Sequence, residues 1–213
     1  MEAIKSLQVV EGPSMLPKTP PSRQIRAHLT ERTLRVYQAY SAEIADGALR
    51  AQTFVPPFKL DRMTWIKPSF LWMMYRSGWA TKKEQERILA IDITRMGFDW
   101  CLDNACLSHF DPTVHVSRSV WQHARDTLPV LVQFDPERSI RLDRLDFRTI
   151  QIGLAGEAVD KYIHEWIVGI SDVTSVAYEI WELLKCGDDD AAKLRLPRES
   201  HYPCYAPHLG ITS

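Results

Sequence analysis

Four short stretches predict β-strands, and in the first and the last of them the residues alternate between two faces. The predicted strands cover residues 33–40, 87–94, 129–134 and 147–154. In the last of them Ile150 and Ile152 fall on one face, and Thr149 and Gln151 fall on the other. The third strand is followed by the sequence Asp-Pro-Glu-Arg, which predicts a turn over residues 135–138.

Apolar residues spaced three and four apart predict the helices. One helix follows Ser41, which is placed to cap it, and a second has Pro68 in its first turn and ends at Gly78. The predicted helices cover residues 42–52, 68–77, 98–106, 159–170 and 173–184. The segment between residues 107 and 128 has no clean period, so we predict a long loop there with one helical turn.

These elements predict an α+β fold, with a mainly antiparallel sheet, flanking helices and a helical C-terminal third. The proline-rich residues 1–22 are predicted to be a flexible leader. Residues 23–203 are predicted to form a single globular domain, because a chain of 213 residues suits one well-buried core. Residues 204–213 are predicted to form an extended tail.

Composition and charge narrow the classes of partner. A net charge of −1 creates no overall field for nucleic acid or anionic lipid, so an anion must be bound by a local cluster of cations. No apolar run is long enough to span a membrane, and the four cysteines match no zinc motif. We therefore expect a cytoplasmic protein with reduced thiols, no metal and no membrane partner.

The stretch from residue 61 to residue 80, DRMTWIKPSFLWMMYRSGWA, carries the most informative chemistry. Arg62, Lys67 and Arg76 could together bind a phosphate or a carboxylate. Trp65, Trp72 or Tyr75 could stack against a planar ring. In the alternative interpretation the arginines pair with Asp61, Asp92 or Glu86 and the aromatic residues are core.

Neutral polar residues supply a second group of candidates. Gln38 lies near the end of a predicted strand, Ser69 near a helix start and Gln151 on a late strand. Each could be a structural hydrogen-bonding residue, whereas together they could line a cleft that binds a ring amide. Glycine-rich phosphate loops, GxSxG and HExxH are all absent from the sequence.

Several strings carry a resemblance to a known family. They are VYQAYS (36–41), the stretch 61–80, QERILAI (85–91), VQFDPER (132–138) and RTIQIGL (148–154). Together they resemble the family called domain of unknown function 4291, over roughly residues 23–203. This resemblance implies a shared fold but no activity.

A second resemblance is to ADP-ribosyltransferase-like folds. Tyr37-Gln38-Ala39-Tyr40-Ser41 is similar to their aromatic-His-Gly-Thr/Ser strand, with Gln38 in place of the histidine. The segment 66–70 and its helix would form the nicotinamide pocket, with Tyr75 as a stacking residue. Gln151 stands in place of the catalytic glutamate, for which Glu137 or Glu157 could substitute. The resemblance implies NAD as the cofactor.

The leading hypothesis is an enzyme-like domain that binds a nucleotide or NAD-like ligand and transfers ADP-ribose. Gln38 would orient the ligand, Ser69 would line the pocket, and Gln151 would lie near the reacting bond. The predicted ligand-binding residues are Arg26, Tyr37, Arg62, Trp65, Lys67, Tyr75 and Arg76. The alternatives are a non-catalytic module that binds RNA or protein through a cationic, aromatic surface, and an interaction scaffold whose cations are all paired internally.

Overall fold

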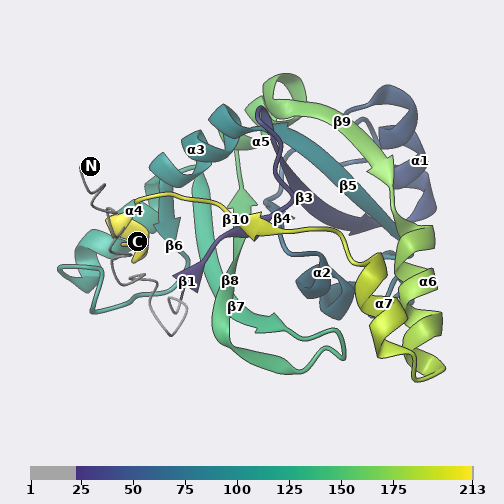
Figure 1. Ribbon diagram of the computed structural model, residues 1–213. Helices are drawn as coiled ribbons and strands as arrows, with labels where there is room; N and C mark the ends of the chain where they lie inside the picture. Colours follow the sequence, from purple (N-terminus) through teal and green to yellow (C-terminus); the bar gives the residue numbers. More distant parts are fainter. Residues whose placement is uncertain (1–22, 213) are drawn as a thin grey trace, which may run out of the picture.

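The computed structural model describes residues 23–212, so the predicted leader over residues 1–22 lies outside the described residues. The described chain has the predicted α+β architecture with largely antiparallel sheets (Figure 1). None of its helices combines the length and the apolar character that crossing a bilayer demands.

The strands lie close to the predicted positions in the first half of the chain. Their bounds are β1 Arg23–Gln24, β2 Arg26–Ala27, β3 Thr33–Tyr40, β4 Thr64–Ile66, β5 Arg87–Thr94, β6 Ala105–Leu107, β7 Val130–Arg138, β8 Arg144–Leu154, β9 Ile167–Asp172 and β10 Ser200–His201. The predicted strands over 33–40 and 87–94 are confirmed at both ends by β3 and β5.

Helices fill most of the intervals between these strands. Their bounds are α1 Ala42–Ala51, α2 Phe70–Ser77, α3 Arg95–Asp103, α4 Arg118–Thr127, α5 Glu157–Lys161, a π-helix Tyr162–Trp166, α6 Thr174–Lys185, α7 Asp189–Arg195 and a 3-10 helix Pro207–Leu209. Ser41 is the N-cap residue of α1, as predicted, but its side chain makes no capping hydrogen bond.

The strands form two main sheets. The first sheet has the order β1-β8-β7-β6, and β4 pairs with β8 outside that path. The second sheet has the order β3-β5-β9 and is entirely antiparallel. A further pair, β2 and β10, ties the C-terminal segment across the middle of the molecule (Figure 1).

The two sheets are joined where β4 ends. The Tyr37 N–H donates to the Lys67 carbonyl at 2.7 Å, and the Lys67 N–H donates to the Tyr37 carbonyl at 3.3 Å. This backbone bridge fixes the start of α2 against β3, and α2 also packs against β7 (Figure 1). The segment that the sequence marks as chemically informative therefore lies at the junction of the two sheets.

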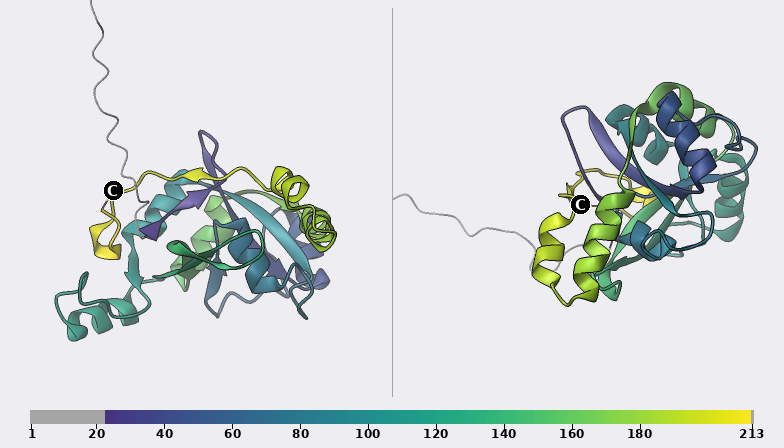
Figure 2. Two further views of the ribbon diagram at one scale, coloured as in Figure 1. Left: turned by 60° about the horizontal axis from the view of Figure 1, so that its bottom comes forward. Right: turned by 90° about the vertical axis from the view of Figure 1, so that its right-hand side faces the viewer.

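The core forms two clusters. The larger includes residues of both sheets, and the smaller gathers α2 and α6 against one face of the second sheet. Met73 and Met74 are 2% and 0% exposed, so both methionines belong to the core. Helices α6 and α7 lie side by side over this smaller cluster (Figures 1 and 2).

The predicted helix over residues 98–106 is displaced. Helix α3 begins at Arg95 because Thr94, the last residue of β5, accepts the Gly97 N–H with its side chain. The helix ends at Asp103, and the next residues form β6, which pairs in parallel with β7. Sequence periodicity misses β6 because all three of its residues are buried and therefore do not alternate.

The predicted loop over residues 107–128 is wrong in its second half, which forms the ten-residue helix α4. Ser117 caps this helix by accepting the Val120 N–H. None of the residues of α4 is buried, and the helix projects from the body of the molecule (Figure 2). Only three residues of α4 are apolar, Val120, Trp121 and Ala124, so its apolar stripe is too short to stand out in the sequence.

The predicted turn over residues 135–138 is also wrong, because β7 continues through it to Arg138. The Ser108 N–H donates to the Val132 carbonyl, so the backbone N–H and C=O of Val132, and of every second residue from it along β7, point toward the β6 side. Pro136 falls on that side, beyond the end of β6, where its missing N–H leaves no strand partner unsatisfied. The chain reverses later, near Leu142, whose φ is 65°.

The predicted helix over residues 159–170 ends early. Helix α5 and the π-helix end at Trp166, and Ile167–Asp172 is the edge strand β9 instead. Ile170 pairs with Ile91 of β5, and the β-branched residues of this segment suit a strand. The C-terminal third is therefore not wholly helical. Its last residues include the 3-10 helix, and Leu209 and Ile211 are buried.

Gly97 provides a test of this packing. A Cβ atom there would lie 2.4 Å from Cγ of the buried Trp166 indole, which has no room to move. We expect Gly97→Ala to lower the free energy of unfolding by about 1 to 3 kcal/mol, because overpacking outweighs the better helix propensity of alanine. Urea denaturation measures this change.

Gly47→Ala in α1 is the matched control. Its Cβ would lie 3.4 Å from Val55, which is ordinary contact. This variant should be as stable as the parent or up to about 1 kcal/mol more stable. Equal effects of the two substitutions would contradict the packing of Trp166 on α3.

Candidate functional site

A cavity of about 270 Å³ opens between β3, β4 and α2. It brings together five of the predicted site residues, with Lys83 and Glu84 on the same walls. The predicted site residues in it are Gln38, Arg62, Trp65, Lys67 and Arg76. We call this the cationic cavity.

Local sequence explains why the cations converge there. β4 pairs with β8, and the chain then crosses to β3 through the Lys67 bridge. Ser69 caps α2 by accepting the Trp72 N–H at 3.0 Å, so the helix begins at Phe70. Pro68 therefore lies before the N-cap and not in the first turn, contrary to the prediction. Gly78 ends the helix in the left-handed region, as predicted.

Lys67 is the buried cation of the cavity, with 5% of its surface exposed. Its Nζ lies 5.0 Å from the centroid of the Trp72 ring. No carboxylate in the described chain forms an ion pair with it. Burial, followed by the charge of Arg76, lowers the pKa of Lys67 to about 8, and the more weakly acting Asp135 opposes this shift.

The other cations of the cavity are exposed and equally unpaired. Neither Arg62 nor Arg76 forms an ion pair within residues 23–212, and Glu84 makes none with them. The alternative in which Asp92 neutralises one of them is wrong, because Asp92 binds Arg35 through two hydrogen bonds of 2.8 Å. The cavity therefore has an excess of positive charge.

Gln38 has its hydrogen-bonding groups occupied within the protein, and it is 2% exposed. Its Nε2 lies within hydrogen-bonding distance of the Tyr40 hydroxyl, the Thr64 hydroxyl and the Trp65 carbonyl, at 2.8, 2.8 and 3.2 Å. Its Oε1 accepts the hydroxyl of Tyr162, a fully buried residue, at 2.9 Å. The Gln38 side chain thus has a structural role: it holds Thr64 and Trp65, which line the cavity, in place.

Ser69 belongs to a separate carboxyl cluster at the N-terminus of α2. The Ser69 hydroxyl donates to Glu137 at 2.9 Å, and the Phe70 N–H donates to Glu199 at 2.8 Å. Arg26 donates to the Glu199 backbone carbonyl at 3.0 Å. Glu137, which the ADP-ribosyltransferase resemblance offers as a substitute glutamate, therefore lies beside Ser69.

Burial perturbs both carboxyl groups. It raises the pKa of Glu137, and it raises the pKa of Glu199 to about 8, with Glu137 adding to the shift and Arg26 opposing it. Sequence reasoning missed Glu199 entirely. No local motif marks it, because it reaches α2 only through the pairing of β10 with β2.

The remaining predicted residues lie outside the cationic cavity. Gln151 donates to Asp135, which also accepts from Gln133 at 2.8 Å. The Tyr75 ring lies under the Arg138 guanidinium, 3.5 Å from its carbon to the ring centroid. Tyr37 is fully buried against Phe70, with ring centroids 5.4 Å apart, and burial raises the pKa of its hydroxyl.

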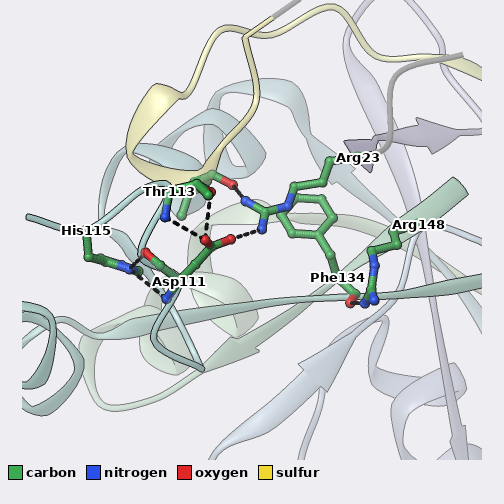
Figure 3. A network of polar contacts seen from close by, with 7 residues as sticks. Arg23, Asp111, Thr113, His115, Phe134 and Arg148 are labelled. Atoms are coloured by element: carbon green, nitrogen blue, oxygen red, sulfur yellow. Dashed lines mark hydrogen bonds and ion pairs between the residues drawn. The ribbon is translucent and has the colours of Figure 1, made fainter. Parts of the chain in front are cut away.

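A larger cavity, of about 470 Å³, lies near the carboxyl end of β6 and the middle of β7. Its charges are largely satisfied from within (Figure 3). Arg23 pairs with Asp111 at 2.5 Å and lies 5.2 Å from the Phe134 ring centroid, while Arg148 donates to the Phe134 carbonyl. The pKa of Asp111 falls to about 2 through hydrogen bonds from Thr113 and the charge of Arg23. The smaller cationic cavity is therefore the better candidate for a charged ligand.

Comparisons with known proteins identify the family alone. The family model described as Domain of unknown function (DUF4291) matches residues 24–202. A search of curated proteins finds no match. In the part of the chain that the structure describes, no three His, Cys, Asp or Glu side chains gather as metal ligands.

The role of Gln38 can be tested through stability. Gln38→Met should lower the free energy of unfolding by about 2 to 3 kcal/mol, because the Tyr162 hydroxyl loses its buried acceptor. Gln85→Met is the matched control, since Gln85 lines the same cavity and no hydrogen bond engages its side chain in the described structure. Parental stability of Gln38→Met would contradict this structural role.

Glu199 should give the protein a measurable pH dependence. Its folded-state pKa of about 8 lies above the ordinary value of 4.5, so the folded state holds a proton that the unfolded state releases. The stabilising contribution of Glu199 is therefore complete at low pH and is lost as the pH rises through about 8.

We expect urea midpoints of the parent to fall more steeply between about pH 5 and about pH 8 than those of Glu199→Gln. Glu31→Gln, a substitution in an exposed loop, should keep the parental slope. Parallel pH profiles of the parent and Glu199→Gln would show that Glu199 titrates alike in both states.

Proposed function

Since the chain belongs to the family described as Domain of unknown function (DUF4291), a description that states no activity, we propose a function from the geometry. The cationic cavity binds a phosphate-bearing, nucleotide-like ligand. The observation that carries this proposal is Lys67, a cation that is 5% exposed and has no anionic partner in the described chain.

Electrostatics favours an anion at this place. Removing an ammonium group from water is costly unless an opposite charge compensates, and Arg76 adds repulsion. A phosphate among Lys67, Arg62 and Arg76 would offset both costs. Guanidinium groups bind phosphate oxygens in pairs, so the two arginines suit this role better than lysines would.

Trp65 supplies the feature that favours a nucleotide over inorganic phosphate. It lines the cationic cavity, and its indole packs over Gly153 of β8. A Cβ atom at Gly153 would lie 3.0 Å from this ring, so the glycine permits the close approach that positions the indole. A half-buried indole beside unpaired cations suits a ligand that has a planar base and a phosphate.

NAD and ADP-ribosyl transfer form the finer part of this hypothesis. NAD belongs to the same ligand class, because it joins phosphates to planar rings. Transfer chemistry would depend on groups outside the cavity, such as Ser69 with its partner Glu137. Single-stranded RNA also carries phosphates and bases, so the binding experiment must distinguish RNA binding from nucleotide binding.

The test is calorimetric titration of the full chain with AMP, NAD and a short single-stranded oligonucleotide. Arg76→Ala should weaken AMP binding at least about tenfold, because one charge-assisted contact is lost. Arg195→Ala is the matched control, since Arg195 lies on α7 and pairs with Glu179 at 2.9 Å. It should bind AMP with parental affinity.

The outcomes separate the candidate functions. Tight binding of NAD but not of AMP would assign the dinucleotide. Binding of the oligonucleotide alone, weakening steeply with salt, would replace the proposal by the RNA-binding alternative. Folded protein that binds none of the three ligands at millimolar concentration would refute a nucleotide site.

A further inference from the structure

The Lys67 amine differs from the surface lysine amines of the described chain. Lys185, Lys193 and Lys161 each lie near a carboxylate on their own helix, at 2.6, 2.9 and 3.7 Å. The Lys67 Nζ has neither an ion pair nor a hydrogen bond within residues 23–212, although the residue is 5% exposed. An amine buried in this way, beside a cavity, could react with a ligand as well as attract its charge.

The backbone holds this amine in place. Two hydrogen bonds to Tyr37 fix the residue on both sides of its Cα, and the N-capped helix α2 begins shortly after it. The Trp72 ring lies on one side of Nζ, with its centroid 5.0 Å away. The backbone that carries the amine is thus rigid, and a ligand would reach the amine through the cationic cavity.

We propose that Lys67 is a nucleophile that forms an imine with a phosphorylated aldehyde held in the cationic cavity. This inference rests on the proposed function, because the exposed cations Arg62 and Arg76 would hold the phosphate. It narrows the nucleotide-like ligand class to phosphate esters whose sugar can open to a reactive carbonyl.

The reaction balances without any further reagent. The Nζ lone pair attacks the carbonyl carbon, a proton passes from nitrogen to oxygen, and a carbinolamine forms. Loss of water then breaks the carbon–oxygen bond and leaves a carbon–nitrogen double bond. Amine and aldehyde thus give imine and water, with no oxidant or reductant consumed.

The environment of Lys67 favours the neutral amine that this attack requires. Burial and the charge of Arg76 lower its pKa to about 8, so a useful fraction is unprotonated near neutral pH. The carboxylates nearby do not reverse this, because Glu84 forms no ion pair in the described structure and Asp135 acts only weakly. Exposed lysines keep their proton under the same conditions.

The experiment treats the full chain with pyridoxal 5′-phosphate and then with sodium borohydride, which reduces the imine to a stable secondary amine. Intact mass and peptide mapping locate the adduct. Lys67 should be labelled at least about tenfold faster than any other lysine. AMP should protect it, and pyridoxal without the phosphate should react more slowly.

Two variants serve as controls. Lys67→Arg keeps the charge but cannot form the imine, so the adduct should disappear. Lys193→Arg alters an exposed lysine of α7, outside the cavity, and should leave the labelling of Lys67 unchanged. Peptide mapping of the parent gives the answer even if Lys67→Arg fails to fold.

The result also separates this inference from the proposed function. Labelling of exposed lysines with Lys67 unmodified, while AMP binding still depends on Arg76, would overturn the nucleophile and leave the nucleotide site standing. Labelling of Lys67 that ignores both AMP and the phosphate of the probe would overturn the phosphate requirement and leave the nucleophile.

Discussion

The junction between the two sheets depends on hydrogen bonds made by two neighbouring residues of β3. Tyr37 exchanges backbone hydrogen bonds with Lys67, and Gln38 binds the Thr64 side chain and the Trp65 carbonyl. Because these groups are buried, each must be satisfied, and only one register of β4 against β3 does so. The position of β4 then dictates where α2 begins and where the cationic cavity opens. The fold and the candidate site therefore share one constraint.

That constraint has a cost, because it brings a lysine into the interior. The backbone of Lys67 is held against Tyr37, the residue is 5% exposed, and its amine borders the cavity without an ion pair in the described chain. A site with unpaired cations on a rigid strand end is less stable than a paired one but better organised for an anion. We interpret the unpaired charge as the mark of a ligand site.

The same physics explains what could be predicted from sequence. Strands β3 and β5 were predictable, since both are rich in β-branched, aromatic and other apolar residues, and the cations of the cavity lie close together in the chain. Strand β9 was not predictable, because the spacing of Ile163, Trp166 and Ile170 fits a helical stripe. Only the pairing with β5, which is not visible in the sequence, makes this segment a strand. Glu199 was out of reach for another reason: its pKa is raised by burial in the folded chain, where it lies against the N-terminus of α2, about 130 residues away, and nothing adjacent to it in the sequence signals this.

The first turn of α2 separates the charges of this region. The N-terminus of a helix carries partial positive charge, which favours carboxylates and disfavours cations. Glu199 takes the Phe70 N–H, and Glu137 takes the hydroxyl of the capping Ser69. The side chain of Lys67, two residues before the cap, lies beside Trp72 and borders the cationic cavity, and it makes no such contact. The N-terminus of α2 thus binds the two acidic side chains. The buried amine of Lys67 has no such partner, so loss of its proton or binding of an anion in the cavity would offset the cost of its charge.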